Sequence, residues 1–435
     1  MSVKKGLLIV LVAGALLLGM GSSSANTRFF KDSAASVNTN LYLGEEIVIS
    51  TLDNIQYLPS VAYNWKHDEY LVVWQNTWGG SSDIYAQRIS GQGELKSWFS
   101  VDPTAPMNPY PNDRALPSVA YDPVNDRYLV VWLYDTSGNY TNYDVHGIFV
   151  NWNGPIQGLH QFVICDWLTQ QDMPKVAYSR TEQEFMIVWL TEHPSVPAYI
   201  SGRRMKASDG TFISTGSDFT ISNPTEVRAR PEIAYNLTRN EYLVVYDNMQ
   251  DVFGTRFTGK GLPLAGGEFG IAGWPGAEIR PSVAACRETD QYLVAWQNPQ
   301  PDIYARFING DGSLNGGPLL LDSTSIGEVR PKVTCNSAGN QFFVVWQQQF
   351  SNITGPYGIW GQFVNSDKTL GSGFGIMTPT AGITAEFTTP AVAGGSVNYL
   401  AVWEHDRPGT AFQDIHGRLI TPYEIFLPLV LRNHQ

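Results

Sequence analysis

The sequence contains little of what marks several common classes of protein. Its 28 lysine and arginine residues are outnumbered by 40 aspartate and glutamate residues, so the net charge is −12. Nucleic acids and anionic membranes bind basic surfaces, and neither is therefore an expected partner. Only three cysteines occur, and no CxxC spacing is present. This predicts neither a disulfide framework nor a zinc or redox motif.

Motifs that carry catalysis or bind cofactors are missing as well. The chain has no HExxH, no GxSxG motif at a predicted strand-to-helix turn and no glycine-rich phosphate loop. No helical periodicity follows the first 25 residues. From motifs alone we predict no catalytic residue, no cofactor and no metal.

The N-terminus has the pattern of an export signal. Lys4 and Lys5 precede an apolar stretch at 6–20, which is followed by small residues that suit cleavage after Ala25. The stretch is shorter than the roughly 20 apolar residues that a membrane-spanning helix requires. We therefore expect a signal peptide at 1–25 and a mature chain that is secreted, extracellular or at the cell surface, without a membrane span.

A unit of 50–59 residues occurs seven times and dominates the chain. Each copy opens with a proline and a short apolar strand, at Pro59, Pro117, Pro174, Pro231, Pro281, Pro331 and Pro390. A second strand ends in an aromatic residue, at Trp74, Trp132, Trp189, Tyr246, Trp296, Trp346 and Trp403. Five copies start a third strand with aspartate, at Asp83, Asp144, Asp251, Asp302 and Asp414, and fourth strands such as Phe99–Val101 follow. Four short strands in such a period are typical of a β-propeller blade.

These repeats predict an all-β fold: a seven-bladed β-propeller with four antiparallel strands per blade, over residues 46–421. A lead-in at 26–45 precedes it, and a short apolar tail at 422–435 follows. Only six fourth strands follow a repeat, whereas Ile47–Ile49 has the matching spacing to the next proline. We therefore expect this N-terminal strand to close the ring beside the third strand of the last repeat, near His416 to Leu419, which removes two sheet edges.

The repeats resemble those of bacterial secreted β-propellers, whose signature Pro-Ser-Val-Ala-Tyr, Tyr-Leu-Val-Val-Trp and Asp-Ile-Tyr-Ala-Gln-Arg stands most fully at 59–63, 70–74 and 83–88. The resemblance covers 46–420 and implies the fold, not an activity. The apolar tail is similar to C-terminal tails on secreted proteins of some filamentous bacteria.

Three arginines are the candidate ligand-binding residues. Arg230, Arg280 and Arg330 each precede the repeat proline, and the acidic residues Glu278 and Glu328 lie two residues before two of them. Planar guanidinium groups around one axis suit an anionic ligand. In this the chain resembles sialidases, although the Asp-box motif of that family is missing. The alternative, which we favour, is that each arginine pairs with a nearby glutamate as a strut between repeats.

Other candidates have simpler structural interpretations. The repeated aspartates are expected to cap loop N–H groups, and the repeated tryptophans are expected to form the core. His146 and His416 occupy a slot that holds aromatic residues in other repeats, so we favour packing over a metal pair. Cys286 and Cys335 lie at similar places in adjacent repeats, where buried thiols are favoured over a bridge.

Two functions from different classes are consistent with this sequence. The first is an extracellular scaffold or binding module that recognises a glycan, peptide or protein partner at the channel face. The alternative is a carbohydrate-active hydrolase or lyase that uses the acidic and arginine residues of that face. The lack of a singular constellation of residues favours the first.

Overall fold

The computed structural model describes residues 41–103, 113–135, 142–167, 169–213, 218–273, 276–298, 300, 302–322, 327–336, 340–350, 356–379 and 386–422. The predicted signal peptide and most of the predicted tail lie outside these residues. Among the described residues, no helix is long and apolar enough to span a membrane.

The strands follow the repeats in chain order, and four sheets have four antiparallel strands each. The third repeat holds β11 (Gln170–Ser179), β12 (Glu184–His193), β13 (Val196–Lys206) and β14 (Phe219–Thr220). The fourth holds β15 (Ala229–Asn236), β16 (Glu241–Asp247), β17 (Val252–Thr258) and β18 (Pro263–Ala272). The fifth holds β19 (Ile279–Cys286), β20 (Gln291–Gln297), β21 (Ile303–Asn309) and β22 (Leu314–Asp322). The sixth holds β23 (Glu328–Cys335), β24 (Gln341–Gln349), β25 (Tyr357–Asn365) and β26 (Phe374–Met377).

Two further sheets depart from this pattern. The second repeat has five strands, β6 (Arg114–Asp122), β7 (Arg127–Asp135), β8 (Tyr143–Asn151), β9 (Gly154–Pro155) and β10 (Phe162–Cys165). The last and first repeats share one eight-stranded sheet with β27 (Phe387–Gly394), β28 (Tyr399–Asp406), β29 (Gln413–Pro422), β1 (Leu41–Ser50), β2 (Ile55–Asn64), β3 (Glu69–Trp78), β4 (Ser81–Ser90) and β5 (Leu95–Ser100).

The prediction of a seven-bladed β-propeller with four antiparallel strands per blade is therefore wrong. The described strands form five separate blades and the eight-stranded sheet, in which Ile55 of β2 forms a parallel bridge with Gln413 of β29. The cause is the short connection at 51–54: β1 pairs with β29, so the chain that leaves β1 enters β2 beside the start of β29.

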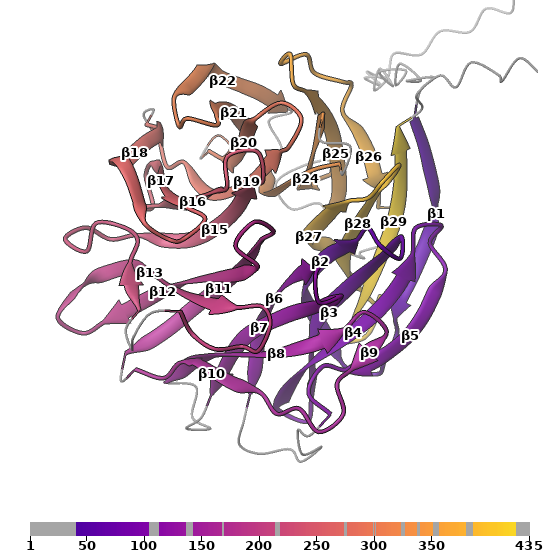
Figure 1. Ribbon diagram of the computed structural model, residues 1–435. Coiled ribbons are helices and arrows are strands. Elements are labelled where there is room, and N and C mark those ends of the chain that lie inside the picture. Colours follow the sequence, from indigo (N-terminus) through magenta and orange to yellow (C-terminus); the bar gives the residue numbers. More distant parts are fainter. Residues whose placement is uncertain are drawn as a thin grey trace, which may run out of the picture. The chain divides into compact units, whose positions relative to one another are not determined.

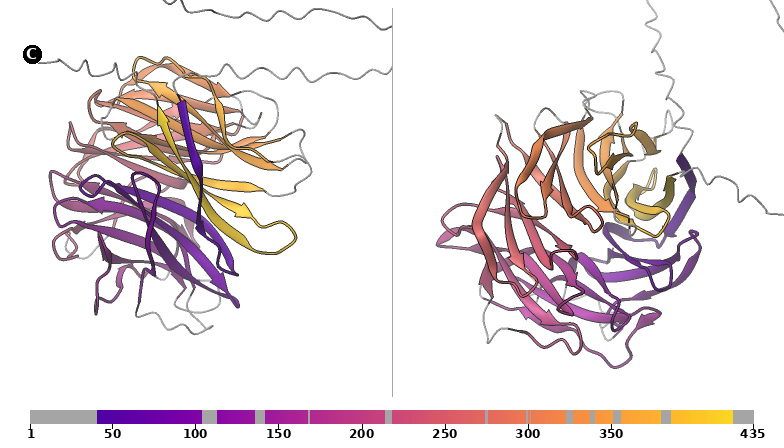
Figure 2. Two further views of the ribbon diagram at one scale, coloured as in Figure 1. Left: turned by 90° about the vertical axis from the view of Figure 1, so that its right-hand side faces the viewer. Right: turned by 45° about the horizontal axis from the view of Figure 1, so that its top comes forward.

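The predicted pairing of the N-terminal strand is confirmed. β1 runs antiparallel to β29, with Ile47 opposite Gly417 and Val48 opposite His416. It begins at Leu41, within the segment predicted as a lead-in. Figures 1 and 2 show the indigo strand beside the yellow one.

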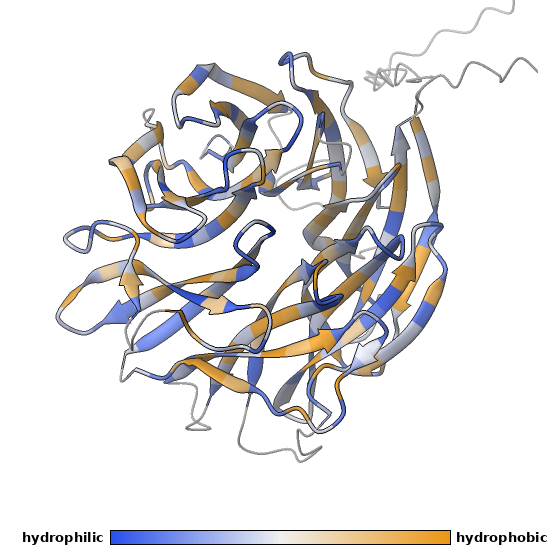
Figure 3. Cartoon of the chain, viewed as in Figure 1, coloured by the Kyte–Doolittle hydropathy of each residue, from blue (hydrophilic) through white to orange (hydrophobic). Residues whose placement is uncertain are grey.

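The first strand of each repeat contacts the first strands of the repeats on either side, and β2 contacts both β6 and β27. The described sheets thus follow one another around a ring (Figure 2, right). Their second strands lie between two partners and are buried on both faces, which explains their unbroken apolar runs. The most hydrophobic stretches in Figure 3 lie within strands. The predicted core role of the aromatic series is confirmed, since Trp74, Trp132, Trp189, Tyr246, Trp296, Trp346 and Trp403 are at most 1% exposed.

The turn after the first strand explains the tyrosine of the repeat. Asn64 Oδ1 accepts hydrogen bonds from the N–H groups of Lys66 and His67, at 3.0 and 3.2 Å. Asp68 then takes a positive φ of 48° and accepts a hydrogen bond of 2.8 Å from the Tyr63 hydroxyl. Such side-chain turns favour Asn and Asp in these positions.

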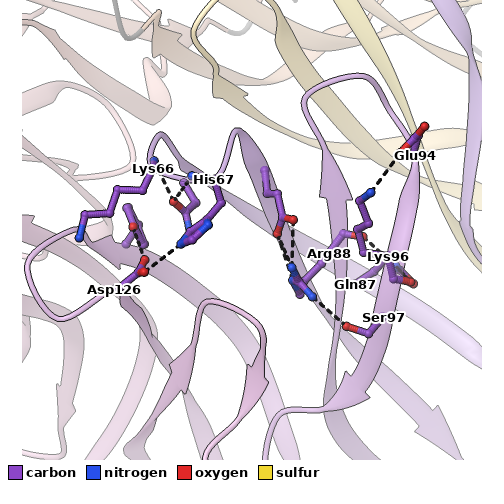
Figure 4. Close-up of polar contacts among 11 residues, drawn as sticks. Lys66, His67, Gln87, Arg88, Glu94, Lys96, Ser97 and Asp126 are labelled. Carbon is purple, nitrogen blue, oxygen red and sulfur yellow. Dashed lines mark hydrogen bonds and ion pairs between the residues drawn. The ribbon is translucent and has the colours of Figure 1, made fainter.

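The same turn joins neighbouring repeats, as Figure 4 shows for the first two. His67 Nε2 lies 2.8 Å from Asp126 Oδ2, and the His67 ring stacks on Trp152 at 3.9 Å between centroids. Arg88 pairs with Glu69 across β3 and β4, at 2.7 Å. These polar contacts hold strands and neighbouring repeats together and are therefore structural.

Cys286 and Cys335 form a disulfide between β19 and β23, with Cα atoms 5.5 Å apart. The expectation of two buried thiols is wrong, because their equivalent positions in adjacent repeats bring the two strands side by side. Cys165 is a buried free cysteine.

Candidate functional site

A pocket of about 650 Å³ opens where the fifth, sixth, seventh and first repeats meet. The residues that line it are mainly polar: Tyr57, Leu58, Arg280, Gln297, Val329, Arg330, Gln347, Tyr357, Glu386, Thr388, Thr389, Glu404 and Gln413. It takes no residue from the second, third or fourth repeats among the described residues, so the pocket lies to one side of the ring axis.

The pocket is continuous with the central channel, because Leu58, Arg280, Arg330 and Thr389 line both. The channel holds about 370 Å³ and is lined by the first strands of all seven repeats. Within it, Glu232 Oε1 lies 3.2 Å from Lys175 Nζ and also contacts Lys332. Burial alone would raise the pKa of Glu232, but the two lysines hold it below its ordinary value.

The residue before each repeat proline has an unusual backbone. Its φ lies between 47° and 56° in every repeat, at Leu58, Leu116, Met173, Arg230, Arg280, Arg330 and Thr389. The pairing register shifts at the same place in each first strand, which marks a β-bulge. A bulge changes the direction of a side chain at the end of a ladder. It places the three predicted arginines at the cavity walls.

The amide of this bulge residue is bound by the preceding repeat. The acceptor is the side chain that follows the repeat aromatic residue, in pairs Gln75–Leu116 (3.4 Å), Asp247–Arg280 (3.0 Å), Gln297–Arg330 (2.8 Å) and Glu404–Leu58 (2.7 Å). The position directly after the repeat aromatic residue, here called the junction slot, therefore contributes both to the pocket wall and to the contact between neighbouring repeats. Sequence reasoning missed it because the slot varies among Gln, Asp, Glu and Leu.

The structure brings Arg280 and Arg330 into the pocket, whereas Arg230 lines the channel. Arg230 Nη1 pairs with Asp247 Oδ1 at 2.8 Å, and Arg330 Nη1 donates to Thr389 Oγ1 at 2.9 Å. Burial lowers the pKa of Arg280, and the nearby guanidinium groups of Arg330 and Arg230 lower it further. The guanidinium group of Arg280 is thus close enough to those of Arg330 and Arg230 to be repelled by both.

The acidic residues predicted with these arginines lie elsewhere. Glu278 and Glu328 are 2% and 0% exposed, and neither is among the described residues that line the pocket or the channel. Glu226, the acidic residue four positions before Arg230, pairs with Arg228 at 2.9 Å.

Two carboxylates that sequence reasoning missed do line the pocket, Glu386 and Glu404. Glu404 accepts hydrogen bonds from the Leu58 N–H and, at 2.6 Å, from Thr388 Oγ1. Burial raises the pKa of Glu404 and also that of Glu386, to which Asp406 adds repulsion. Glu404 directly follows the repeat aromatic residue Trp403. Recognition of this position as a recurring polar site would have identified Glu404 from the sequence.

Two of the repeated aspartates, Asp83 and Asp414, lie close to an arginine side chain. Asp83 Oδ1 accepts from the Ile84 N–H at 3.1 Å and lies 3.5 Å from Arg114. Burial raises the pKa of Asp83 to about 6.

Several tryptophans lie outside the buried aromatic series of the repeats. Trp65, Trp78, Trp98 and Trp167 are exposed, and Trp274 lies outside the described residues.

No protein-family model matches this chain, and no curated protein does. Among solved structures it is similar to a polysaccharide lyase, at 9% identity and a TM-score of 0.52, over 84% of this chain and 90% of the lyase. It is also similar to a fungal alcohol oxidase in complex with copper, at 10% identity and a TM-score of 0.50, over 88% of this chain and 77% of the oxidase. Identities this low show the fold alone. With the ring of sheets, they define the protein as a β-propeller.

Proposed function

We propose that this β-propeller is an extracellular binding module whose pocket recognises a saccharide that carries a carboxylate. The observation that carries the proposal is the presence of Arg280 and Arg330 in one pocket. A ligand carboxylate between these guanidinium groups would accept paired hydrogen bonds and relieve their mutual repulsion.

The rest of the pocket wall supports a saccharide as the source of that carboxylate. The amides of Gln297, Gln347 and Gln413 offer donors and acceptors, which suit ring hydroxyl groups. Tyr57 and Tyr357 add aromatic surface with a polar edge. A mainly polar wall with a few aromatic rings fits a sugar better than an apolar ligand.

An extracellular location has two independent supports. The segment 1–25 has the pattern of a signal peptide. The Cys286–Cys335 disulfide fits an oxidising compartment, where such bonds persist.

The test is calorimetric titration of the mature protein with uronic-acid oligosaccharides and with the same oligosaccharides after reduction of their carboxyl groups. We expect binding of the acidic forms only, and at least a roughly tenfold loss in Arg280→Met, since charged hydrogen bonds of about 1.5–3 kcal/mol are removed. Arg287→Met is the matched control, because Arg287 is in the same repeat but pairs with Glu288 on the surface. Undiminished binding by Arg280→Met would contradict the proposal, and preferential capture of acidic peptides would replace the saccharide with a peptide.

A second function is favoured by one observation. Glu386 and Glu404 line the same pocket, and the pKa of each is raised, as a general acid in a hydrolase or lyase requires. Release of reducing ends or unsaturated products from the same oligosaccharides would support it. Glu386→Gln should then lose turnover while it keeps binding. If the unmodified protein releases no product, the binding module is the function that remains.

A further inference from the structure

Three potential metal ligands meet across the strands that close the ring. Glu46 lies on β1, His405 on β28 and His416 on β29, and these strands are adjacent. His416 Nδ1 is 2.6 Å from Glu46 Oε1, and His416 Nε2 is 3.2 Å from His405 Nδ1. One ligand atom from each residue lies within 4.8 Å of the others. The cluster therefore exists only when β1 is in place.

The contact with Glu46 orients His416 as a ligand. A carboxylate oxygen only accepts hydrogen bonds, so the Nδ1 atom of His416 carries the proton in this contact. In a neutral imidazole the other nitrogen is then an acceptor, and its lone pair faces His405 Nδ1. Metal-bound histidines commonly donate their second N–H to a carboxylate in this way.

The spacing of the two nitrogens fits a tetrahedral ion. Two zinc–nitrogen bonds of about 2.0–2.1 Å at a tetrahedral angle place the nitrogens roughly 3.3–3.4 Å apart, close to the 3.2 Å observed. The two rings meet nearly at right angles, with 86° between their planes. His405 is held in this position by stacking on Phe387, at 4.7 Å between centroids.

The surroundings leave the cluster open to a cation. His416 is 6% exposed, whereas Glu46 and His405 are only partly buried, so an ion has a route of entry. The charged groups that act on the cluster are Asp406, Asp414 and Arg418, of which Asp414 also pairs with Arg407 at 2.7 Å. Because neighbouring side chains in a strand face opposite sides, His405 does not share the face of Glu404, and the cluster is separate from the pocket.

We propose that His405 and His416 bind a divalent transition-metal ion such as zinc, with Glu46 fixing the tautomer of His416, and that the ion fastens β1 to the last repeat. Imidazole nitrogens select zinc, copper or nickel over calcium and magnesium, which prefer oxygen ligands. Since the site requires β1 to be paired, the ion binds the closed ring and stabilises it.

The experiment uses the mature protein without a histidine tag, freed of metal with a chelator that is then removed. Titration with zinc chloride up to about 100 µM at neutral pH should show one ion per chain, with a rise in Tm of about 2 °C or more. Calcium chloride at the same concentration should produce neither effect. Failure of the unmodified protein to bind zinc in this range would overturn the proposal.

Variants identify the ligands. His405→Gln and His416→Gln should lose zinc binding and the Tm shift, and Glu46→Gln should weaken binding about 10–100-fold. His146→Gln is the matched control, because His146 occupies the slot of His416 in another repeat and packs against Tyr134, at 4.5 Å between ring centroids. If His416→Gln fails to fold, the partly buried His405 decides the test. Binding at full stoichiometry in His405→Gln would refute the site.

Discussion

Glu404 Oε1 accepts a hydrogen bond of 2.7 Å from the backbone N–H of Leu58, a residue 346 positions earlier in the chain. The same junction between neighbouring repeats is made by Asp247 or by glutamine elsewhere in the ring. Here it joins the last repeat to the first, so one side chain of the pocket wall also holds the ring closed.

Replacement of Glu404 by alanine should lower the free energy of unfolding by about 1–3 kcal/mol, because the half-buried Leu58 amide loses its acceptor. Glu404→Gln should retain most of the stability, since glutamine performs this role at Gln75 and Gln297. Urea unfolding followed by tryptophan fluorescence measures both. Equal losses in the two variants would show that the hydrogen bond is not the cause.

Arg280→Met should raise Tm by about 1–3 °C in low salt, because it removes a charge that Arg330 and Arg230 repel. Methionine fits the slot, since Met173 occupies it in the third repeat with φ of 51°. The gain should shrink in about 0.5 M salt, which screens the repulsion. A lower Tm at every salt concentration would contradict this expectation.

Ile49→Ala should cost about 2–4 kcal/mol, because Ile49 is 5% exposed and belongs to the core shared by the first and last repeats. Its neighbour Val48 is 45% exposed, so Val48→Ala should change stability by less than about 0.5 kcal/mol. Deletion of residues 26–50 should cause aggregation or a much lower Tm, because β29 loses the strand that pairs with it and becomes an exposed edge. Thermal melts with light scattering compare the three, and a deletion that melts like the parent would count against closure by β1.

Reduction of the Cys286–Cys335 disulfide should lower stability by about 2–4 kcal/mol, as expected for a bond that spans 49 residues. Thiol titration of the denatured, unreduced protein should find one free cysteine, Cys165, and three after reduction. Three thiols before reduction would rule out the bridge.

His146 should make the protein sensitive to acid. Burial lowers the pKa of His146 to about 4, below its ordinary value of 6.5. Between these values the unfolded chain binds the proton more readily, so stability is lost as pH falls from 6.5 towards 4, by an amount on the order of 2 kcal/mol. His146→Phe, which copies Phe253 in the fourth repeat, should remove this part of the pH dependence. Melting curves from pH 7 to pH 4 measure it, and parallel curves for the two proteins would contradict the assignment.

Much of the fold was predictable because it is encoded within each repeat. The proline, the buried aromatic residue and the strand at Ile47–Ile49 lie at fixed spacings, and the pairing of this strand with the segment near His416 to Leu419 followed from those spacings. The merging of the first and last repeats into one sheet was not predictable, because it depends on the short path from β1 to β2 beside Gln413.

The pocket was only partly predictable. Arg280 and Arg330 stood out because they recur before a proline, whereas Glu386 does not belong to any repeated position that the sequence made visible. The histidine cluster was missed for a different reason. His416 occupies an aromatic slot of the repeat, and its partner Glu46 comes from a strand at the other end of the chain.

The pairing of β1 with β29 sets an order on how the chain folds as it is made. Synthesis proceeds from the N-terminus, so β1 is made long before the strand that it must join. Until β29 has been made, the intermediate has a free strand that is prone to pair with other molecules. Contacts between such distant segments also slow folding, because a very long loop must close before they form. The ring therefore cannot close before β29 has been made, and the yield of soluble protein should depend on how well the unpaired first strand is kept from other chains until then.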